Sequence, residues 1–221
     1  MTSDAQVLGW YSEGDGAVIR DSDRIVARWW GGNLMPPDAG VPAAKDVPVI
    51  ASPGWIDAED DEPVSPRDPG VSFRTFMAGG RDAAEAGRRR AVEAGTELIL
   101  RPSAASALSD IPSVRAAAKA WGGDDPTRVL IDPAGLFTPE MVRTAEDHLE
   151  RMAEELIGLE PVWGVLVTDL REGPGRWEAA PIGAGVLPVE SLAMVARVAV
   201  ERGRAVVVLG EPAGQAALLG L

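Results

Sequence analysis

Three short apolar runs, each ending in a carboxylate, constrain the fold of this chain more than any other feature of its sequence. They are residues 128–132, 165–169 and 206–211, with Asp132, Asp169 and Glu211 as the acids. Short apolar runs that are rich in Val, Ile and Leu and bounded by turn residues are typical of strands buried on both faces, as in a parallel sheet. Each acid is therefore expected at the carboxyl end of a buried strand.

Helical patterns separate these strands. The clearest covers Thr138–Leu156, where Thr138 suits the N-cap, Pro139 the first helical position and Gly158 the exit. Parallel strands need crossovers of about a dozen or more residues, and from residue 82 onward helices supply them. The alternation predicts one α/β domain over residues 1–221, a (β/α)₈ TIM barrel with eroded helices in its N-terminal half. An open doubly wound sheet is the rival fold, but no G-x-G-x-x-G follows the first strand.

The remaining elements are expected from local patterns of apolar, turn and capping residues. The first half should hold strands at Gln6–Ser12, Pro48–Ser52 and Val71–Met77, and a solvated loop at Asp57–Pro69. Ala17–Ile19 and Arg24–Trp30 are extended, as a hairpin or as a strand with an irregular entry. Further along, we expect helices at Asp82–Ala94, Ile111–Trp121 and Pro188–Arg202, strands at Glu97–Arg101 and Ala205–Leu209, a polar loop at Arg171–Ala180, and a short closing helix from Ala213.

Charge and composition exclude several classes of function. The chain has 34 acidic against 21 basic residues, a formal net charge of -13, which opposes binding to nucleic acid or to an anionic membrane. It has no Cys, which excludes disulfides, thiolate metal sites and cysteine nucleophiles. No signal peptide is visible and no apolar run approaches the roughly 18 residues of a membrane span, so a cytoplasmic location is expected. The abundance of Ala, Gly, Arg and Val suggests a high-GC bacterial source.

From residue 73 to the end, the order and spacing of the motifs resembles the xylose isomerase-like TIM barrel superfamily. This group includes the sugar phosphate isomerases/epimerases and is related to the endonuclease IV barrels. Residues 128–132 are similar to the family strand that ends in Asp, with a His three residues later, and 165–169 to the strand that carries a His and then an Asp. Residues 181–187 resemble the Gly-x-Gly stretch before the last long helix, and 206–211 the closing strand with its metal-binding Glu.

The resemblance implies a divalent metal bound through Glu, Asp, His and Glu, and most of that set is replaced here. Arg101, Gly135, Leu166 and Gly210 stand at or near four expected ligand positions, whereas Asp132 and Asp169 are kept and Glu211 lies one residue beyond its position. The chain is thus expected to be a degenerate member without a resident cofactor. Its two aspartates remain compatible with a weakly held Mg²⁺ or Mn²⁺.

The site residues expected at the carboxyl ends of the strands fall into two groups. Catalytic roles are predicted for Asp132, Asp169 and Arg101, and substrate binding for Arg74, Trp10 and Glu211, with Ser12, Glu13 and Ser52 as further candidates. Structural roles are the alternative, in which Asp132 caps the following turn and Asp169 pairs with Arg171 or Arg101. Arg101 either forms a structural ion pair or clamps an anionic substrate.

Three other features are expected to be structural. His148 is the single His, so it cannot form a multi-His site, and a packing role in its helix is predicted. The arginines 88–90 should form a solvated helix face. The aromatic residues of the N-terminal half should pack or face a partner, with the alternative that several line the barrel mouth: Trp10, Tyr11, Trp29, Trp30 and Trp55.

Two functions follow from the resemblance and its departures. The first is isomerase/epimerase-like chemistry on a small sugar-like or polyol substrate, with an aspartate as base and a cation holding the oxyanion. The second is a catalytically inactive barrel that serves as a binding or assembly subunit. The expected partner is a small molecule or a protein, with no nucleic acid or membrane, and a homo-oligomer is compatible. An enzyme should keep an open polar pocket joining Arg101, Asp132 and Asp169, whereas a binding subunit should have its mouth filled by side chains.

Overall fold

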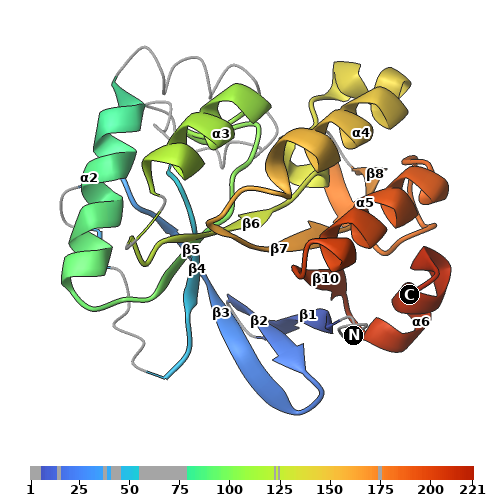
Figure 1. Cartoon of the computed structure of the whole chain (residues 1–221), viewed down its shortest axis with the longest axis horizontal. Helices are drawn as coiled ribbons and strands as arrows, with labels where there is room; N and C mark the ends of the chain where they lie inside the picture. The colour runs from blue at the N-terminus through green and yellow to red at the C-terminus, as the bar shows by residue number, and fades with distance from the viewer. Residues whose placement is uncertain are drawn as a thin grey trace.

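The computed structural model describes residues 6–13, 16–36, 39–40, 46–54, 79–121, 123, 125–173 and 176–221. Eight strands close a barrel in the order β1-β10-β7-β6-β5-β4-β3-β2 (Figure 1). Their bounds are β1 Val7–Glu13, β2 Gly16–Asp21, β3 Arg24–Asn33, β4 Val49–Ser52, β5 Leu98–Leu100, β6 Arg128–Ile131, β7 Val162–Val167 and β10 Ala205–Leu209. The predicted fold class is therefore confirmed. The strand predicted at Val71–Met77 lies outside the described residues.

The first three strands form an antiparallel meander within the barrel. β2 runs antiparallel to both β1 and β3, whereas β1–β10 and every pair from β3 round to β10 are parallel. A two-residue turn at Ser22 and Asp23 joins β2 to β3, with Ser22 in the left-handed region at φ 53°. Short turns suffice for antiparallel neighbours, so this part of the barrel needs no crossover helix. The meander resolves the alternatives left open for these segments in favour of the hairpin.

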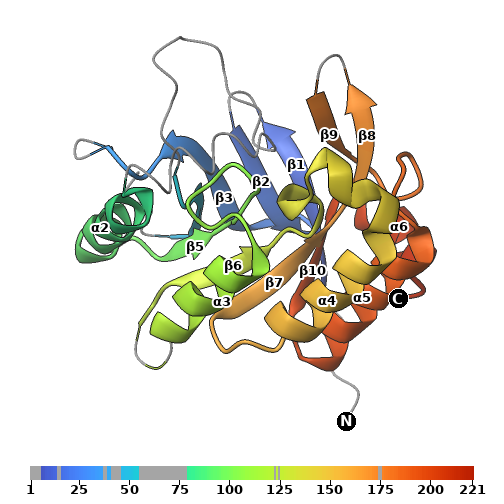
Figure 2. The same ribbon diagram turned by 90° about the horizontal axis from the view of Figure 1, so that it is seen from above.

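In the described part of the chain, α-helices follow the later strands and lie on the outside of that part of the barrel (Figure 2). They are α2 Gly80–Glu93, α3 Ile111–Ala120, α4 Ala145–Leu156, α5 Val189–Glu201 and α6 Pro212–Leu219. The segment predicted as one helix, Thr138–Leu156, is instead a 3₁₀ helix (Pro139–Thr144) followed by α4, because Thr144 leaves the helical region at φ -123° and ψ 38°. No helix among the described residues is long and apolar enough to cross a membrane.

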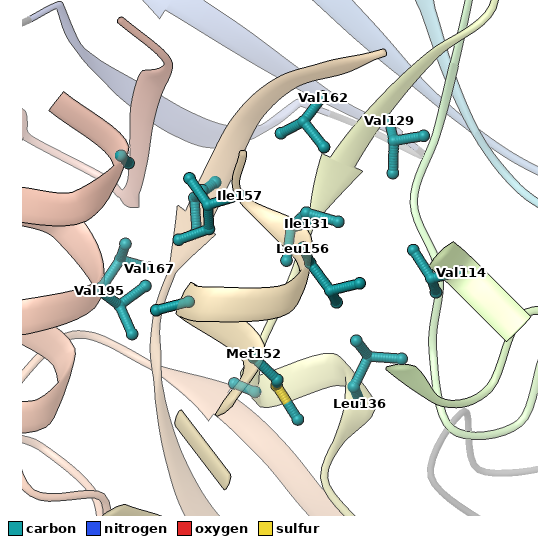
Figure 3. Packing of buried hydrophobic residues seen from close by; sticks show 14 of the residues in the cluster. Val114, Val129, Ile131, Leu136, Met152, Leu156, Ile157, Val162, Val167 and Val195 are labelled. Carbon is teal, nitrogen blue, oxygen red and sulfur yellow. The ribbon is translucent and has the colours of Figure 1, made fainter. Parts of the chain in front are cut away.

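Alternation along each strand divides the apolar residues between two cores. The outer core lies between strands and helices, where Ile131 and Val167 pack with Leu156 and Val195 (Figure 3). The inner core fills the barrel with a residue or more from each strand: Leu8, Ile19, Ala27, Ile50, Ile99, Leu130, Leu166, Ala205 and Val207. Strands buried on both faces explain why their sequences read as continuous apolar runs.

The polar loop predicted at Arg171–Ala180 is wrong in part, because this segment belongs to a hairpin. β8 (Asp169–Gly173) pairs antiparallel with β9 (Arg176–Ala180) as a separate two-stranded sheet. Across the sheet, Arg171 donates a hydrogen bond to Glu178 at 3.3 Å. Opposite charges on facing strands stabilise a short polar hairpin that has little apolar alternation to reveal it.

The arginines 88–90 do not form the predicted solvated face. Arg88 is buried, with 7% of its surface exposed, and donates hydrogen bonds to Glu85, Asp125 and Thr127. The hydrogen bonds from Arg88, together with its charge, lower the pKa of Glu85 to about 2. Only the middle arginine is largely exposed. Partners 37 and 39 residues away in the sequence make the burial of Arg88 invisible to a local pattern.

Candidate functional site

The carboxyl ends of the parallel strands meet at one mouth, where every strand places one residue inward. Each of these residues is two positions from an inner-core residue of the same strand, on the side of the mouth. Alternation along the strand therefore directs it to the same inward face. They are Trp10, Ala17, Trp29, Ser52, Arg101, Asp132, Thr168 and Leu209. In barrel order, β4, β5, β6 and β7 supply a polar arc, and β10, β1, β2 and β3 an apolar arc that includes the two tryptophans. We call this set the mouth ring.

Arg101 and Asp132 form an ion pair within the polar arc. Arg101 donates from Nε and Nη2 to the same oxygen, Asp132 Oδ2, at 3.0 and 2.6 Å. The other oxygen, Oδ1, accepts the backbone N–H of Gly135 at 2.9 Å. Asp132 is 1% exposed and the Arg101 side chain 21%. Both structural alternatives are thus realised together, since Asp132 caps the following turn and pairs with Arg101.

The guanidinium of Arg101 also reaches the apolar arc. Its central carbon lies 5.2 Å from the ring centre of Trp10 and 5.4 Å from that of Trp29. The two rings are themselves 5.9 Å apart, tilted by 51°. A cation over aromatic faces is stabilised by roughly 0.5–2 kcal/mol, more as it loses water. Arg101 therefore crosses the mouth from β5 and links β6 to β1 and β3.

Gly135 permits this arrangement because a side chain there would collide with it. A Cβ at position 135 would overlap Asp132 Oδ2, the oxygen that accepts both bonds from Arg101. The position that resembles the family His therefore has no room for a side chain while Asp132 keeps this conformation. The turn residues Pro133 and Gly135 after the strand are the sequence signal for such a cap.

Replacing Gly135 with Ala is expected to lower the free energy of unfolding by about 2 kcal/mol, the usual cost of overpacking a buried site. The Cβ must push the Asp132 carboxylate away from Arg101. Chemical denaturation monitored by circular dichroism measures the change. The matched control is Gly214→Ala in α6, where a Cβ meets nothing within 4 Å and a stabilisation of about 0.5–1 kcal/mol is expected. Equal effects of the two variants would contradict the overlap.

Asp169 does not join the ion pair of the mouth. It is 0% exposed, and its oxygens accept four backbone N–H groups, those of Leu170 (2.7 Å), Gly183 (3.2 Å), Gly185 (2.8 Å) and Leu187 (2.8 Å). The carboxylate of Asp169 is therefore paired with backbone N–H groups and not, as the structural alternative had predicted, with Arg171 or Arg101. The carboxylate fixes the segment between β9 and α5, and this segment includes the Gly-x-Gly stretch.

The predicted substrate-binding residues are scattered. Trp10 lies in the mouth ring, whereas Glu211 is exposed at the N-cap of α6 and accepts the backbone N–H of Ala213 at 3.1 Å. Glu211 lines a separate cavity of about 790 Å³ with Tyr11 and Ser12. Arg74 lies outside the described residues. Among the further candidates, Ser52 is in the mouth ring and accepts the N–H of Gly54 at 3.2 Å.

Sequence reasoning missed Thr168. It is 1% exposed, and its hydroxyl has no hydrogen-bond partner in the described part of the chain. Leu166 belongs to the inner core, so alternation places Thr168 on the inward face at the mouth. The available signal was this two-residue spacing from Leu166. A buried hydroxyl without a partner loses about 1–3 kcal/mol of hydrogen bonding, which a polar ligand can restore.

The described residues do not fit the divalent metal that the resemblance implies. No cluster of three or more His, Asp or Glu side chains that could hold a metal ion occurs among them. A hard cation takes six or more oxygen ligands, yet in the mouth ring both oxygens of Asp132 accept hydrogen bonds, and one of them faces a guanidinium. His148, the single imidazole of the chain, packs edge-on against Phe137 with ring centres 5.9 Å apart.

Comparisons with known proteins give distant structural neighbours. No family model and no curated protein matches the chain. The solved structures similar to it include endonuclease IV from Thermus thermophilus, at 18% identity over 78% of this chain and 58% of that one, with a TM-score of 0.49. Another is a xylose isomerase-like TIM barrel protein from Mycobacterium smegmatis in complex with magnesium, at 12% identity, 79% and 61% coverage and a TM-score of 0.45.

A third is the apo form of 3-keto-D-glucoside 4-epimerase from E. coli, at 16% identity over 78% of this chain and 63% of that chain, with a TM-score of 0.40. The chain thus spans about three-fifths of the length of each of these structures. The pairing of its own strands shows that the chain is a closed barrel, and a xylose isomerase-like TIM barrel protein is among its structural neighbours.

Proposed function

We propose that this barrel binds a small sugar-like or polyol molecule at its mouth and does not catalyse its isomerisation. The observation that supports binding is the division of the mouth ring into a polar and an apolar arc. A sugar has the same division, with hydroxyl groups on its edge and C–H groups on its faces. Its faces suit Trp10 and Trp29, and its hydroxyls suit Arg101 and Thr168, a few polar groups among aromatic walls as in most ligand sites.

The state of Asp132 argues against catalysis. A general base must lie within hydrogen-bond reach of the proton that it removes. Asp132 is 1% exposed, and each of its oxygens already accepts at least one hydrogen bond. The side chain of Arg101 also occupies the space between Asp132 and the two tryptophans. In this arrangement the carboxylate positions Arg101 for binding.

An isomerase/epimerase-like enzyme is the second candidate, and one observation favours it. Both bonds from Arg101 end on Asp132 Oδ2, so a single side-chain movement would free that oxygen. Oδ2 could then take a proton from the carbon next to a carbonyl, while Arg101 held the oxygen of the resulting enediolate. Transfer of the hydroxyl proton to the former carbonyl oxygen, and return of the first proton from Asp132 to the former carbonyl carbon, would complete an isomerisation.

Titration calorimetry with a panel of neutral sugars and polyols, with and without EDTA, tests the proposal. Saturable binding that EDTA does not change is expected. Trp10→Leu should weaken it about tenfold, the equivalent of about 1.4 kcal/mol from a lost aromatic contact. Trp163→Leu is the control, because Trp163 packs on the inner core near the start of β7, at the other end of the barrel, and should leave binding unchanged.

Product analysis of the same mixtures separates the two candidates. A binding protein returns every sugar unaltered. An enzyme forms an isomer, and Asp132→Asn abolishes its formation while the fold, checked by circular dichroism, is kept. Failure of the whole panel to bind would contradict both candidates.

A further inference from the structure

A second cavity lies on the outside of the barrel, between α2 and α3. It has a volume of about 390 Å³, within the range of small-molecule sites. The other consecutive helices, from α3 to α6, pack directly on one another. Leu100 and Leu108 line the cavity, and none of the mouth-ring residues does. The cavity is thus an opening in the helical layer that is separate from the mouth.

The wall on the α3 side is apolar and consists mainly of small side chains. It consists of Ala116, Ala117 and Ala120, followed by Trp121 at the end of the helix. Positions three or four residues apart share one face of a helix, as Ala117 does with Ala120 and Trp121, so these side chains form a continuous surface. Such a surface suits the flat face of a ring.

The wall on the α2 side is charged. Arg81, Glu85, Arg88 and Arg89 line it at spacings of four, seven and eight residues from the first, which places them on one stripe of the helix. Three arginines therefore face one glutamate, on a chain whose formal net charge is -13. Even when Asp125, which binds Arg88, is included, the charges around the cavity leave an excess of one positive charge.

Hydrogen bonds hold the base of this wall in one geometry. The Glu85 carboxylate accepts from Arg88 (2.8 and 2.7 Å), from Arg89 (2.9 Å) and from the indole N–H of Trp121 (3.2 Å). The guanidinium of Arg88 lies over the Trp121 ring at 5.4 Å. Glu85 is consequently saturated with donors. Arg81 has no ion-pair partner among the described residues, and the Nη groups of Arg89 donate no hydrogen bond there, so both can bind an anion.

We propose that this cavity binds a small aromatic carboxylate. The ring lies against the alanine wall and Trp121, and the carboxylate accepts hydrogen bonds from Arg81 and Arg89. Arginine is suited to this role because its planar donors match a carboxylate. The inference does not depend on the function of the mouth, because the two sites share no residue.

Binding of 2-naphthoate, compared with neutral 2-naphthalenemethanol, tests the proposal. In the wild-type protein 2-naphthoate should bind saturably by calorimetry and shift the indole N–H signal of Trp121 in NMR spectra. The double variant Arg81→Gln/Arg89→Gln should weaken 2-naphthoate binding at least about tenfold, as expected for lost charge-assisted hydrogen bonds. Its affinity for 2-naphthalenemethanol should stay the same. Both arginines are exposed, so this variant should fold normally.

Two further variants locate the binding. Ala117→Leu fills the cavity from α3 and should abolish the binding of both compounds. Arg115→Gln, which removes a charge outside the cavity where Arg115 pairs with Glu155, should change neither. Absence of saturable 2-naphthoate binding to the wild-type protein overturns the proposal. So does an affinity that the double variant leaves unchanged, because the compound would then be bound elsewhere, for example at the mouth tryptophans.

Discussion

Replacing Arg101 with methionine is expected to lower the free energy of unfolding by about 3–5 kcal/mol, the cost of leaving a buried charge without its partner. Asp132 is 1% exposed, and Arg101 supplies two of its three hydrogen bonds as well as the opposing charge. Methionine keeps much of the aliphatic volume between Asp132 and the two tryptophans, so the loss reports the charge more than a cavity. Urea denaturation at neutral pH measures it.

An exposed ion pair of the same barrel supplies the control. Arg115 donates to Glu155 at 2.6 Å, but its side chain is 45% exposed. Arg115→Met is therefore expected to cost no more than about 1 kcal/mol. Adding Asp132→Asn to Arg101→Met should recover part of the lost stability, since it removes the uncompensated charge. If Arg101→Met and Arg115→Met lower the free energy of unfolding by the same amount, the Arg101–Asp132 pair does not contribute as a buried ion pair.

Replacing Asp169 with asparagine is expected to lower the free energy of unfolding by about 3–4 kcal/mol. Two of the four backbone N–H groups would then face an amide nitrogen in place of an acceptor oxygen. All four donors are held by this one buried side chain. For a chain of this length the melting temperature should fall by roughly 10 °C. Differential scanning calorimetry measures the change.

Glu172→Gln is the matched control for Asp169→Asn. Glu172 lies on the same strand, β8, but is exposed. Its replacement should change the free energy of unfolding by less than about 0.5 kcal/mol. If Asp169→Asn proves equally mild, the segment between β9 and α5 does not depend on this carboxylate. Loss of ligand binding at the mouth in a fully stable Asp169→Asn protein would instead return Asp169 to the functional candidates.

The strands were the most predictable part of the fold. Residues 128–131 and 205–209 form strands within one residue of the predicted bounds, and 162–167 overlaps the predicted run 165–169, because burial on both faces leaves a continuous apolar run. Helix ends at Gly95 and Gly203 were also foreseen, and both glycines have positive φ. Such signals are local, since each depends on residues within one or two turns of the element.

Elements stabilised by polar contacts across the fold were not predictable. The β8–β9 hairpin shows little apolar alternation, and its first residue, Asp169, was expected to end the preceding strand, so most of the hairpin was taken for a loop. Arg88 is one of three consecutive arginines, a pattern typical of a solvated face. Its partners Asp125 and Thr127, however, come later in the chain, after β5 and α3. Thr168 was missed because its inward direction depends on the position of Leu166 in the closed barrel.

The sequence by itself determined that an acid follows each of three buried strands, that Asp132 is followed by a tight turn, and that an arginine stands where a carboxylate was expected. Only the tertiary structure decided what those residues contact. Closure of the barrel brings Arg101 to Asp132, 31 residues away, and to Trp10 and Trp29 on strands from the other end of the chain. In the same closed barrel, the carboxylate of Asp169 accepts hydrogen bonds from backbone amides. Side-chain type and spacing are local properties, whereas the partner of a buried charge depends on which strands become neighbours.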